Sequence, residues 1–235
     1  MILGKIRDML QRMVSGLKTT QGDIIDPKFL DAGLLNYRSE IAYRNYKRDG
    51  ALNEAYYQRI NLIINTDLQS SAPCGSVLLT QPMLNGKQLS IPAFIKLGMN
   101  DGIQFCGSRS GEAWLRIKNR TQLSNIRANH ITNTKNNPCL VYFLWSSAGR
   151  YIECYNDLTV QEGMMYACVA DPLQVAEFNK ETDDFPMDEG DIVELIELLK
   201  NDLISGKAYT PNIKWNTPEG QSEHPFKQTI QQPQQ

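Results

Sequence analysis

The spacing of apolar residues changes sharply along this chain, and that change limits the folds it can adopt. From Ser70 to about Phe178 the helical period disappears, and short β-rich runs alternate with turn signals. Several short strands separated by turns are typical of an antiparallel β sandwich or a partly open barrel. The segments before and after this stretch show helical spacing. The sequence therefore predicts an α+β fold.

Turn signals locate the strands within the central stretch. Asn85-Gly86 supplies the two positive-φ positions of a type I′ hairpin, so the runs on either side should pair. The continuously apolar run Leu140 to Trp145 predicts a buried strand. After a turn, the alternating run Arg150 to Tyr155 predicts the next strand, and Met164 to Ala170 predicts the last one.

The N-terminal part of the chain predicts helices. Residues 2 to 17 carry apolar side chains at helical spacing and predict an amphipathic helix. We expect its apolar face to contact a partner protein or a neighbouring subunit, with a membrane surface as the alternative. A linker is expected from Lys18 to Ile25, where the apolar spacing stops.

A helical hairpin is predicted next. Asp26-Pro27 favours a helix start, because Asp accepts free N–H groups and Pro fits the first turn. This helix should run to about Lys47, and Asp49-Gly50 should end it. A short break between two helices usually produces an antiparallel pair. The second helix of the pair is predicted from the spacing of Leu52, Tyr56, Ile60 and Ile63.

The C-terminal part predicts an amphipathic helix followed by an arm. The helix should start at Asp188, with Glu189 and Asp191 at its positive N-terminal end, and stop near Gly206. From Tyr209 the sequence is polar and proline-bearing, so it cannot fold by burying its own side chains. Its few large apolar residues predict an arm that anchors on another surface, and a disordered tail is the alternative. The proposed anchors are Trp215 and Phe226.

These changes divide the chain into four regions. They are an N-terminal helical region (1–70), a central β domain (71–180), a C-terminal helix (181–208) and the arm (209–235).

Composition limits the classes of function. The formal net charge is −2, from 24 Lys+Arg against 26 Asp+Glu, so the basic excess of a nucleic-acid-gripping protein is missing. The 5 cysteines are widely spaced and mostly lie in apolar stretches, which predicts buried free thiols in a reducing compartment. No apolar run approaches the ~20 residues of a membrane span, and no signal peptide is expected. We therefore expect no membrane partner.

Catalytic and metal-binding patterns are weak. The two histidines are His130 and His224, and a Cys139–His130 dyad lacks the surroundings of known catalytic cysteines. Gly107 to Gly111 is Gly/Ser-rich without a phosphate-loop lysine, so a turn is predicted. We expect no cofactor, no metal and no enzyme activity. Helix capping and a solvated loop explain the one acidic patch better than a cation site does: Asp183, Asp184, Asp188, Glu189 and Asp191.

A cluster of tyrosine and basic residues in the first long helix is the strongest candidate site. It contains Tyr37, Arg38, Tyr43, Arg44 and Arg48. Arg and Tyr are enriched at protein interfaces, and we predict a subunit interface here. The alternatives are a DNA-facing wall, because such residues contact phosphates without reading sequence, and an ordinary solvated face.

The organisation resembles that of a known group of virion proteins. The helical segment Asp26 to Asp31 through Tyr37 to Lys47 resembles the start of head-to-tail connector proteins of tailed phages. The runs Pro92 to Gly98 and Leu140 to Trp145, with the acidic helix after them, resemble structural proteins of crAss-like phages, whose short-tailed virions stack ring proteins below the portal.

The resemblance implies a virion protein assembled in the bacterial cytoplasm. It implies a dodecameric ring of this chain around the DNA channel, in contact with the portal protein and a neighbouring tail ring, with transient non-specific contact to double-stranded DNA. It carries no catalytic residues. The alternatives are another virion part, such as a tail hub, internal protein or capsid accessory protein, and a tail-associated cell-wall hydrolase. A hydrolase would need paired carboxylates in a cleft.

Overall fold

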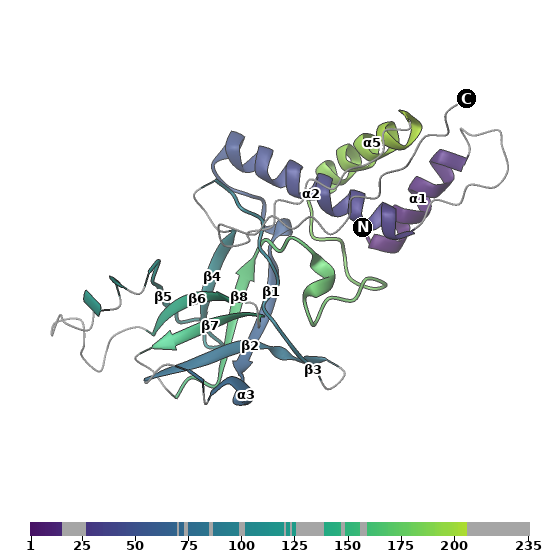
Figure 1. The fold of residues 1–235 in the computed structure, drawn as a ribbon. Helices are drawn as coiled ribbons and strands as arrows, with labels where there is room; N and C mark the ends of the chain where they lie inside the picture. The colour runs from purple at the N-terminus through teal and green to yellow at the C-terminus, as the bar shows by residue number, and fades with distance from the viewer. Residues whose placement is uncertain are drawn as a thin grey trace, which may run out of the picture.

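A layer of three long helices lies at one end of a strongly curled sheet (Figure 1). The fold class is α+β, as predicted, and the sheet forms a partly open barrel. The computed structural model describes residues 1–15, 27–69, 71–72, 75–84, 87–98, 102–119, 121–122, 124–125, 139–146, 149–155 and 159–205.

The first helix, α1 (Leu3–Ser15), is amphipathic, as predicted. Its apolar face contributes Leu3, Ile6 and Leu10 to a core shared with α2 and α5. On its polar side, the Arg7 guanidinium pairs with the Asp31 carboxylate of α2. The prediction that the apolar face contacts a partner or neighbouring subunit is wrong, because helices of the same chain already cover it.

The second helix, α2 (Pro27–Asp49), confirms the predicted helix start and break. Gly50 then adopts a φ of 74°, a left-handed conformation that glycine accepts without strain and that terminates helices. The Asn53 side chain accepts a hydrogen bond of 3.0 Å from the Ala55 N–H and starts a short 3-10 turn, η1 (Glu54–Tyr56). The chain therefore turns away from α2 instead of folding back along it as a second helix.

The predicted partner helix from Leu52 to Ile63 is wrong, because this segment contains a strand, β1 (Gln58–Ile64). Buried and less buried residues alternate along it, with Gln58, Ile60 and Leu62 on the buried side. A spacing of two places them on one face of a strand. The β-branched isoleucines also favour extended backbone. The apolar spacing fitted a helix only because the residues at 60 and 63 are one helical turn apart.

The third long helix, α5 (Glu189–Ser205), confirms the predicted C-terminal amphipathic helix. Acidic residues stand in its first turn, and Ile192, Leu195, Ile196 and Leu199 are buried against α1 and α2. Figure 1 shows α5 lying alongside α2 above the barrel. In the part of the chain that the structure describes, no helix is both long and apolar enough to cross a membrane.

The strands form one sheet in the order β4-β8-β1-β2-β7-β6-β5, and β3 pairs with β2. The pairs are antiparallel, as predicted, except β5 with β6, which is parallel. The remaining strands are β2 (Ser76–Leu84), β3 (Lys87–Leu89), β4 (Ile103–Ser108), β5 (Leu115–Arg116), β6 (Leu140–Ser146), β7 (Gly149–Tyr155) and β8 (Glu162–Ala167).

Several predicted turns and strands are confirmed. Leu84 of β2 pairs with Lys87 of β3, which is the register of a two-residue hairpin. Asn85 and Gly86 themselves lie outside the described residues. Strands β6, β7 and β8 lie where the apolar and alternating runs predicted them. The described residues also include two shorter elements: α3 (Thr66–Gln69) and η2 (Pro172–Gln174).

One segment after β4 joins the two ends of the sheet. The predicted turn at Gly107 to Gly111 is present, and the Gly111 N–H donates to the Ser108 carbonyl at 3.0 Å. The Trp114 N–H then donates to Cys106 of β4 at 2.9 Å. The next residue, Leu115, donates to Cys139 beside β6 at 2.8 Å. Because this segment bonds to both ends of the strand order, it curls the sheet toward a closed barrel.

The barrel interior is filled by apolar side chains. The Trp114 indole packs there against Gly163 of β8, where an added Cβ would lie 2.2 Å from its Cη2 atom. Three cysteines, Cys106, Cys139 and Cys154, are buried in the same core as free thiols. Cys168 is a buried free thiol in the helical core, whereas Cys74 lies outside the described residues.

The chain from Ile91 to Leu97 lies between the two cores. Its backbone joins β7 to the residues after β8, through bonds from Ile91 N–H to the Arg150 carbonyl (2.9 Å) and from Ile95 N–H to the Cys168 carbonyl (2.8 Å). Ile91 belongs to the barrel core, and Leu97 belongs to the helical core. The segment from Ile91 to Leu97 therefore connects the barrel to the helical layer and contributes side chains to both cores.

Candidate functional site

Arg38, predicted at an interface, is buried where α2 meets the barrel. Its side chain is 0% exposed. Nε donates to the Pro186 carbonyl at 2.8 Å, and Nη1 donates to the Val169 carbonyl at 2.5 Å. Nη2 donates to the Tyr56 carbonyl at 3.1 Å. A guanidinium enclosed by its own chain has no surface to offer a partner, so Arg38 serves the fold of the subunit and not an interface.

Burying this cation is costly unless hydrogen bonds replace its water shell. Three backbone carbonyls do so, and the rings of Tyr56 and Phe185 lie 5.8 Å and 5.9 Å from the guanidinium carbon. Burial lowers the pKa of Arg38, because the charged form loses hydration. The acceptors come from three separate segments. Arg38 therefore fixes α2 against the turn before β1, the end of β8 and the approach to α5.

Tyr37 is also engaged within the subunit. Its hydroxyl donates to the Asp202 carboxylate of α5. Burial, together with this hydrogen bond and the charge of Asp202, raises the pKa of Tyr37 to about 12. Tyr37 is half-buried in the α2–α5 contact. It stabilises the pairing of the two helices, which leaves less of its side chain for a partner than the sequence suggested.

Asp191 extends the same polar contact between the helices. Its carboxylate accepts from the Asn45 amide at 2.9 Å and from the Tyr56 hydroxyl at 2.7 Å. Burial and the bond to Asp191 raise the pKa of Tyr56. Asp191 was predicted to favour the positive end of α5, and it also connects that end to α2 and η1.

The remaining predicted interface residues of α2 are exposed. Together with Lys47, they form the basic face of α2: Tyr43, Arg44, Lys47 and Arg48. Arg44 pairs with Glu194 of α5 at 2.5 Å, and the Lys47 ammonium lies 4.8 Å from the Tyr43 ring centroid. Arg48 pairs with its neighbour Asp49 at 2.8 Å. These side chains are held by exposed contacts that a partner could replace.

Exposed acidic residues lie on α5 and the segment leading into it. We call them the α5 acidic group: Asp184, Glu189 and Glu197. Asp188 caps the helix, as predicted, because its Oδ1 accepts from the Gly190 N–H at 3.0 Å. Within the described residues, no three His, Cys, Asp or Glu side chains are placed to hold a metal ion.

The buried thiols are poor nucleophiles. Burial raises the pKa of Cys106 to about 12. The pKa of Cys154 is also raised, first by a hydrogen bond with Cys139 and then by burial. The thiolate is the reactive form, so such thiols are inert at neutral pH. His130, the base of the imagined dyad, lies outside the described residues.

The other two predicted interface residues, Trp215 and Phe226, lie in the arm and outside the described residues. The prediction that they anchor the subunit on another surface stays a prediction.

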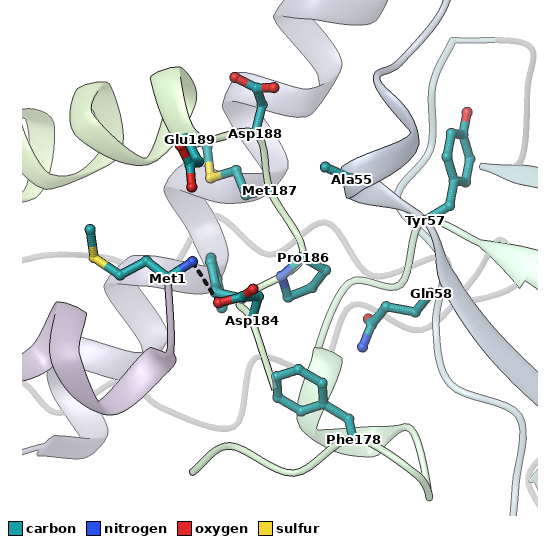
Figure 2. A pocket seen from close by; sticks show the side chains of 11 residues that line it. Met1, Ala55, Tyr57, Gln58, Phe178, Asp184, Pro186, Met187, Asp188 and Glu189 are labelled. Atoms are coloured by element: carbon teal, nitrogen blue, oxygen red, sulfur yellow. Dashed lines mark ion pairs between the residues drawn. The ribbon is translucent and has the colours of Figure 1, made fainter. Parts of the chain in front are cut away.

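A hollow of about 380 Å³ opens between the start of α1, the start of β1 and the approach to α5 (Figure 2). Three acidic residues, Asp184, Asp188 and Glu189, are among those that border it. Gln58 lines it with a buried side-chain oxygen that accepts no hydrogen bond from any residue that the structure describes. The other lining residues are mostly apolar: Met1, Ala55, Tyr57, Phe178, Phe185, Pro186 and Met187.

Sequence reasoning missed this hollow, because Gln58 was assigned to a helix. One signal was available. Gln58 is the polar member of an alternating set with Ile60 and Leu62, so a strand reading would have placed its amide on a buried face.

No protein-family model matches this sequence, and a search of curated proteins found no match to it.

Proposed function

We propose that this protein is a structural virion subunit that assembles with copies of itself into a ring. The ring would belong to a phage head-to-tail connector, below the portal and around the DNA channel. The connector assignment comes from the sequence resemblance. The proposal of self-assembly has support from the surface of the helical layer.

The observation that carries it is the separation of opposite charges on that surface. The basic face of α2 exposes Arg44, Lys47 and Arg48. The α5 acidic group exposes the opposite sign on a neighbouring element of the same layer. In a two-fold dimer the basic face of one copy could also pair with the acidic group of the other, so the charges support self-association and the resemblance supplies the ring. In a ring each subunit uses two different surfaces, and here those surfaces are complementary in charge.

A closed ring also needs a fixed angle between the two contact surfaces of each subunit. Arg38 holds α2 to the barrel through three carbonyls, and Asp191 holds α5 to α2. These bonds are directional and at least partly buried, so they resist rotation of one helix against the other. Such a rigid subunit is suited to a closed assembly.

Charge reversal tests the proposed contact. We expect Lys47→Glu with Arg48→Glu to weaken self-association of the purified chain, and Glu189→Lys with Glu197→Lys to do the same. Light scattering over a range of protein concentrations measures both. Lys118→Glu is the control, because Lys118 is exposed and lies just after β5, on the barrel.

The decisive experiment mixes the two charge-reversed variants. In a head-to-tail contact, the reversed α2 of one variant meets the reversed α5 of the other, and association should return. Wild-type protein that remains a monomer, alone and with the portal, would contradict the proposal. So would association that no reversal affects.

The basic face could instead meet DNA as it passes through the channel. Non-specific binding of duplex DNA should then weaken in the Lys47→Glu, Arg48→Glu variant, with a shallower dependence on salt. If that variant loses DNA binding but assembles normally, the basic face lines the channel and is not a subunit contact.

A further inference from the structure

The hollow in Figure 2 contains a polar group without a partner. Gln58 is 8% exposed, and its Oε1 atom accepts no hydrogen bond from any described residue. Buried amide oxygens are nearly always paired, so an orphan at the wall of a hollow points to a donor that arrives from outside. Figure 2 shows the Gln58 side chain directed toward the space bordered by Pro186 and Phe178.

The charges at the rim identify the donor as a cation. The Asp184 carboxylate pairs with the Met1 amino group at 2.8 Å. Asp188 accepts from Gly190 and from the Asn53 amide. The exposed Glu189 carboxylate has no hydrogen bond or ion pair within the described part of the chain. The hollow thus offers a neutral acceptor in its wall and a free carboxylate at its rim.

The walls add an apolar surface. Phe178 and Pro186 contribute rings, and the volume of about 380 Å³ falls within the range of about 300–1,000 Å³ typical of ligand sites. A cationic side chain beside an aromatic one would satisfy both features. Its ammonium would bond to the acceptors, and the ring would pack on the walls.

The chain itself contains that pattern in its arm. Both aromatic anchors predicted there stand next to a lysine, in Lys214-Trp215 and Phe226-Lys227. Ile213 precedes the first pair and gives it a second apolar neighbour. We propose that the hollow binds the Lys214-Trp215 segment of a second copy of this chain, an inference that rests on the self-assembly proposed above.

The position of the hollow favours a second copy over the same chain. It lies at the start of α5, whereas the arm follows the end of this 17-residue helix, about 24 Å away at 1.5 Å per residue. From Ser205 to Lys214 the chain spans at most roughly 30–32 Å. The arm would have to run back along α5, using about three quarters of that maximum span, to reach its own hollow. A neighbouring subunit removes that requirement.

Substitutions in the full chain test the contact. Lys214→Ala and Gln58→Leu should each raise the concentration at which half of the protein is associated, by roughly tenfold or more in light scattering. The double variant should be little worse than either single one, because both remove the same contact. Gln58→Asn, which keeps an amide but shortens it, provides a second test if Gln58→Leu does not fold by circular dichroism. Gln104→Leu and Lys227→Ala are the matched controls.

Mixing the two variants shows whether the bound arm comes from a second copy or from the same chain. A Lys214→Ala copy keeps an intact hollow, and a Gln58→Leu copy keeps an intact arm. Capture between copies predicts that the mixture forms dimers that neither variant forms alone. Capture within one chain predicts no gain on mixing and would overturn the inference.

Other outcomes separate this inference from the proposed function. Association that is unchanged in Lys214→Ala and Gln58→Leu would overturn the arm contact and leave self-assembly standing. An effect of Lys227→Ala in place of Lys214→Ala would overturn the choice of segment. A monomeric wild type would overturn both proposals.

Discussion

The helical layer and the barrel each have an apolar core, but they differ in the hydrogen bonds that join their elements. In the layer, polar side chains of α2 reach residues far along the chain, as Arg38 does to Pro186 and Tyr37 does to Asp202. In the barrel, the core is formed by apolar side chains such as Trp114, and backbone hydrogen bonds join the strands. Apolar burial is not directional, whereas a hydrogen bond is.

This difference indicates separate roles for the two regions. The barrel is held by its apolar core and by the backbone hydrogen bonds between its strands. The layer fixes an orientation, because a guanidinium with three acceptors tolerates little rotation. The surfaces proposed for assembly lie on the layer, where a fixed orientation matters most.

Removing the buried cation should have the largest effect. Arg38→Met keeps an apolar side chain of similar length but leaves three carbonyls without their donor, each costing about 1–3 kcal/mol. We expect a loss of about 5 kcal/mol in the free energy of unfolding, measured by urea denaturation. Arg48→Met, at an exposed ion pair with its own neighbour, should leave stability unchanged. Equal effects of the two variants would show that the contrast between buried and exposed arginine is mistaken.

Hydrogen exchange of the Arg38→Met variant would sharpen the comparison. If Arg38 fixes the layer to the barrel, amides of α2 and α5 should lose protection while those of β1 and β8 keep it. Uniform loss of protection would mean that the two regions unfold as one unit.

A collision inside the barrel should have the next largest effect. An added Cβ at Gly163 would lie 2.2 Å from the Trp114 side chain. Overpacking of a core costs about 1–3 kcal/mol, and we expect Gly163→Ala to reach the upper end, about 3 kcal/mol. Adding Trp114→Phe should recover part of the loss, because the smaller ring leaves room. Gly4→Ala is the control, since nothing lies within 4 Å of its Cβ position. A neutral Gly163→Ala would mean that the barrel relaxes freely there.

The sequence predicted regular elements better than it predicted which side chains they bury. The three long helices and the strands from Leu140 to Ala167 were located from spacing and turn residues alone. The segment from Leu52 to Ile63 was wrong, because a short apolar run fits both periods and only pairing with β8 decides it. Long-range pairing of this kind leaves no mark on the local sequence.

Arg38 shows a second limit of sequence reasoning. It stands four residues after Leu34 and three before Ile41, both buried, so it lies on the apolar stripe of α2. An arginine on such a stripe is usually taken as a surface residue, since unpaired charges are seldom buried. Its three acceptors are carbonyls of distant segments, and no sequence pattern shows which backbone carbonyls will lie near a given side chain. The orphan oxygen of Gln58 was missed for a different reason, because its segment was assigned to a helix.

Alkaline pH should weaken the subunit through its buried thiols. The folded barrel holds the pKa of Cys106 at about 12, above its ordinary value of 9.0. Below pH 9 both the folded and the unfolded chain keep this proton, so stability is unaffected. As the pH rises from 9 toward 12, only the unfolded chain ionises, and stability falls by about 1.4 kcal/mol per thiol at pH 10. Cys106→Ala should therefore reduce the slope of stability against pH between 9 and 11. Identical slopes would mean that the thiol is hydrated in the folded barrel.

The exposed ion pair between Arg44 and Glu194 should have the smallest effect on stability. Their side chains are 48% and 41% exposed, so water and salt screen the attraction. Pairs of this kind contribute about 0–1 kcal/mol, and we expect Arg44→Ala to cost about 0.3 kcal/mol in urea denaturation, with a similar value for Glu194→Ala.

The double variant should show little coupling energy between the two side chains, and added salt should remove that coupling. Both this pair and the hydrogen bond from Tyr56 to Asp191 use a carboxylate of α5, one exposed and the other partly buried. Comparing the two therefore separates the effect of burial on stability from the effect of charge. A loss from Arg44→Ala as large as that from Arg38→Met would show that charge, not burial, fixes the layer. A negligible loss of stability combined with weaker self-association would place Arg44 among the residues that serve assembly.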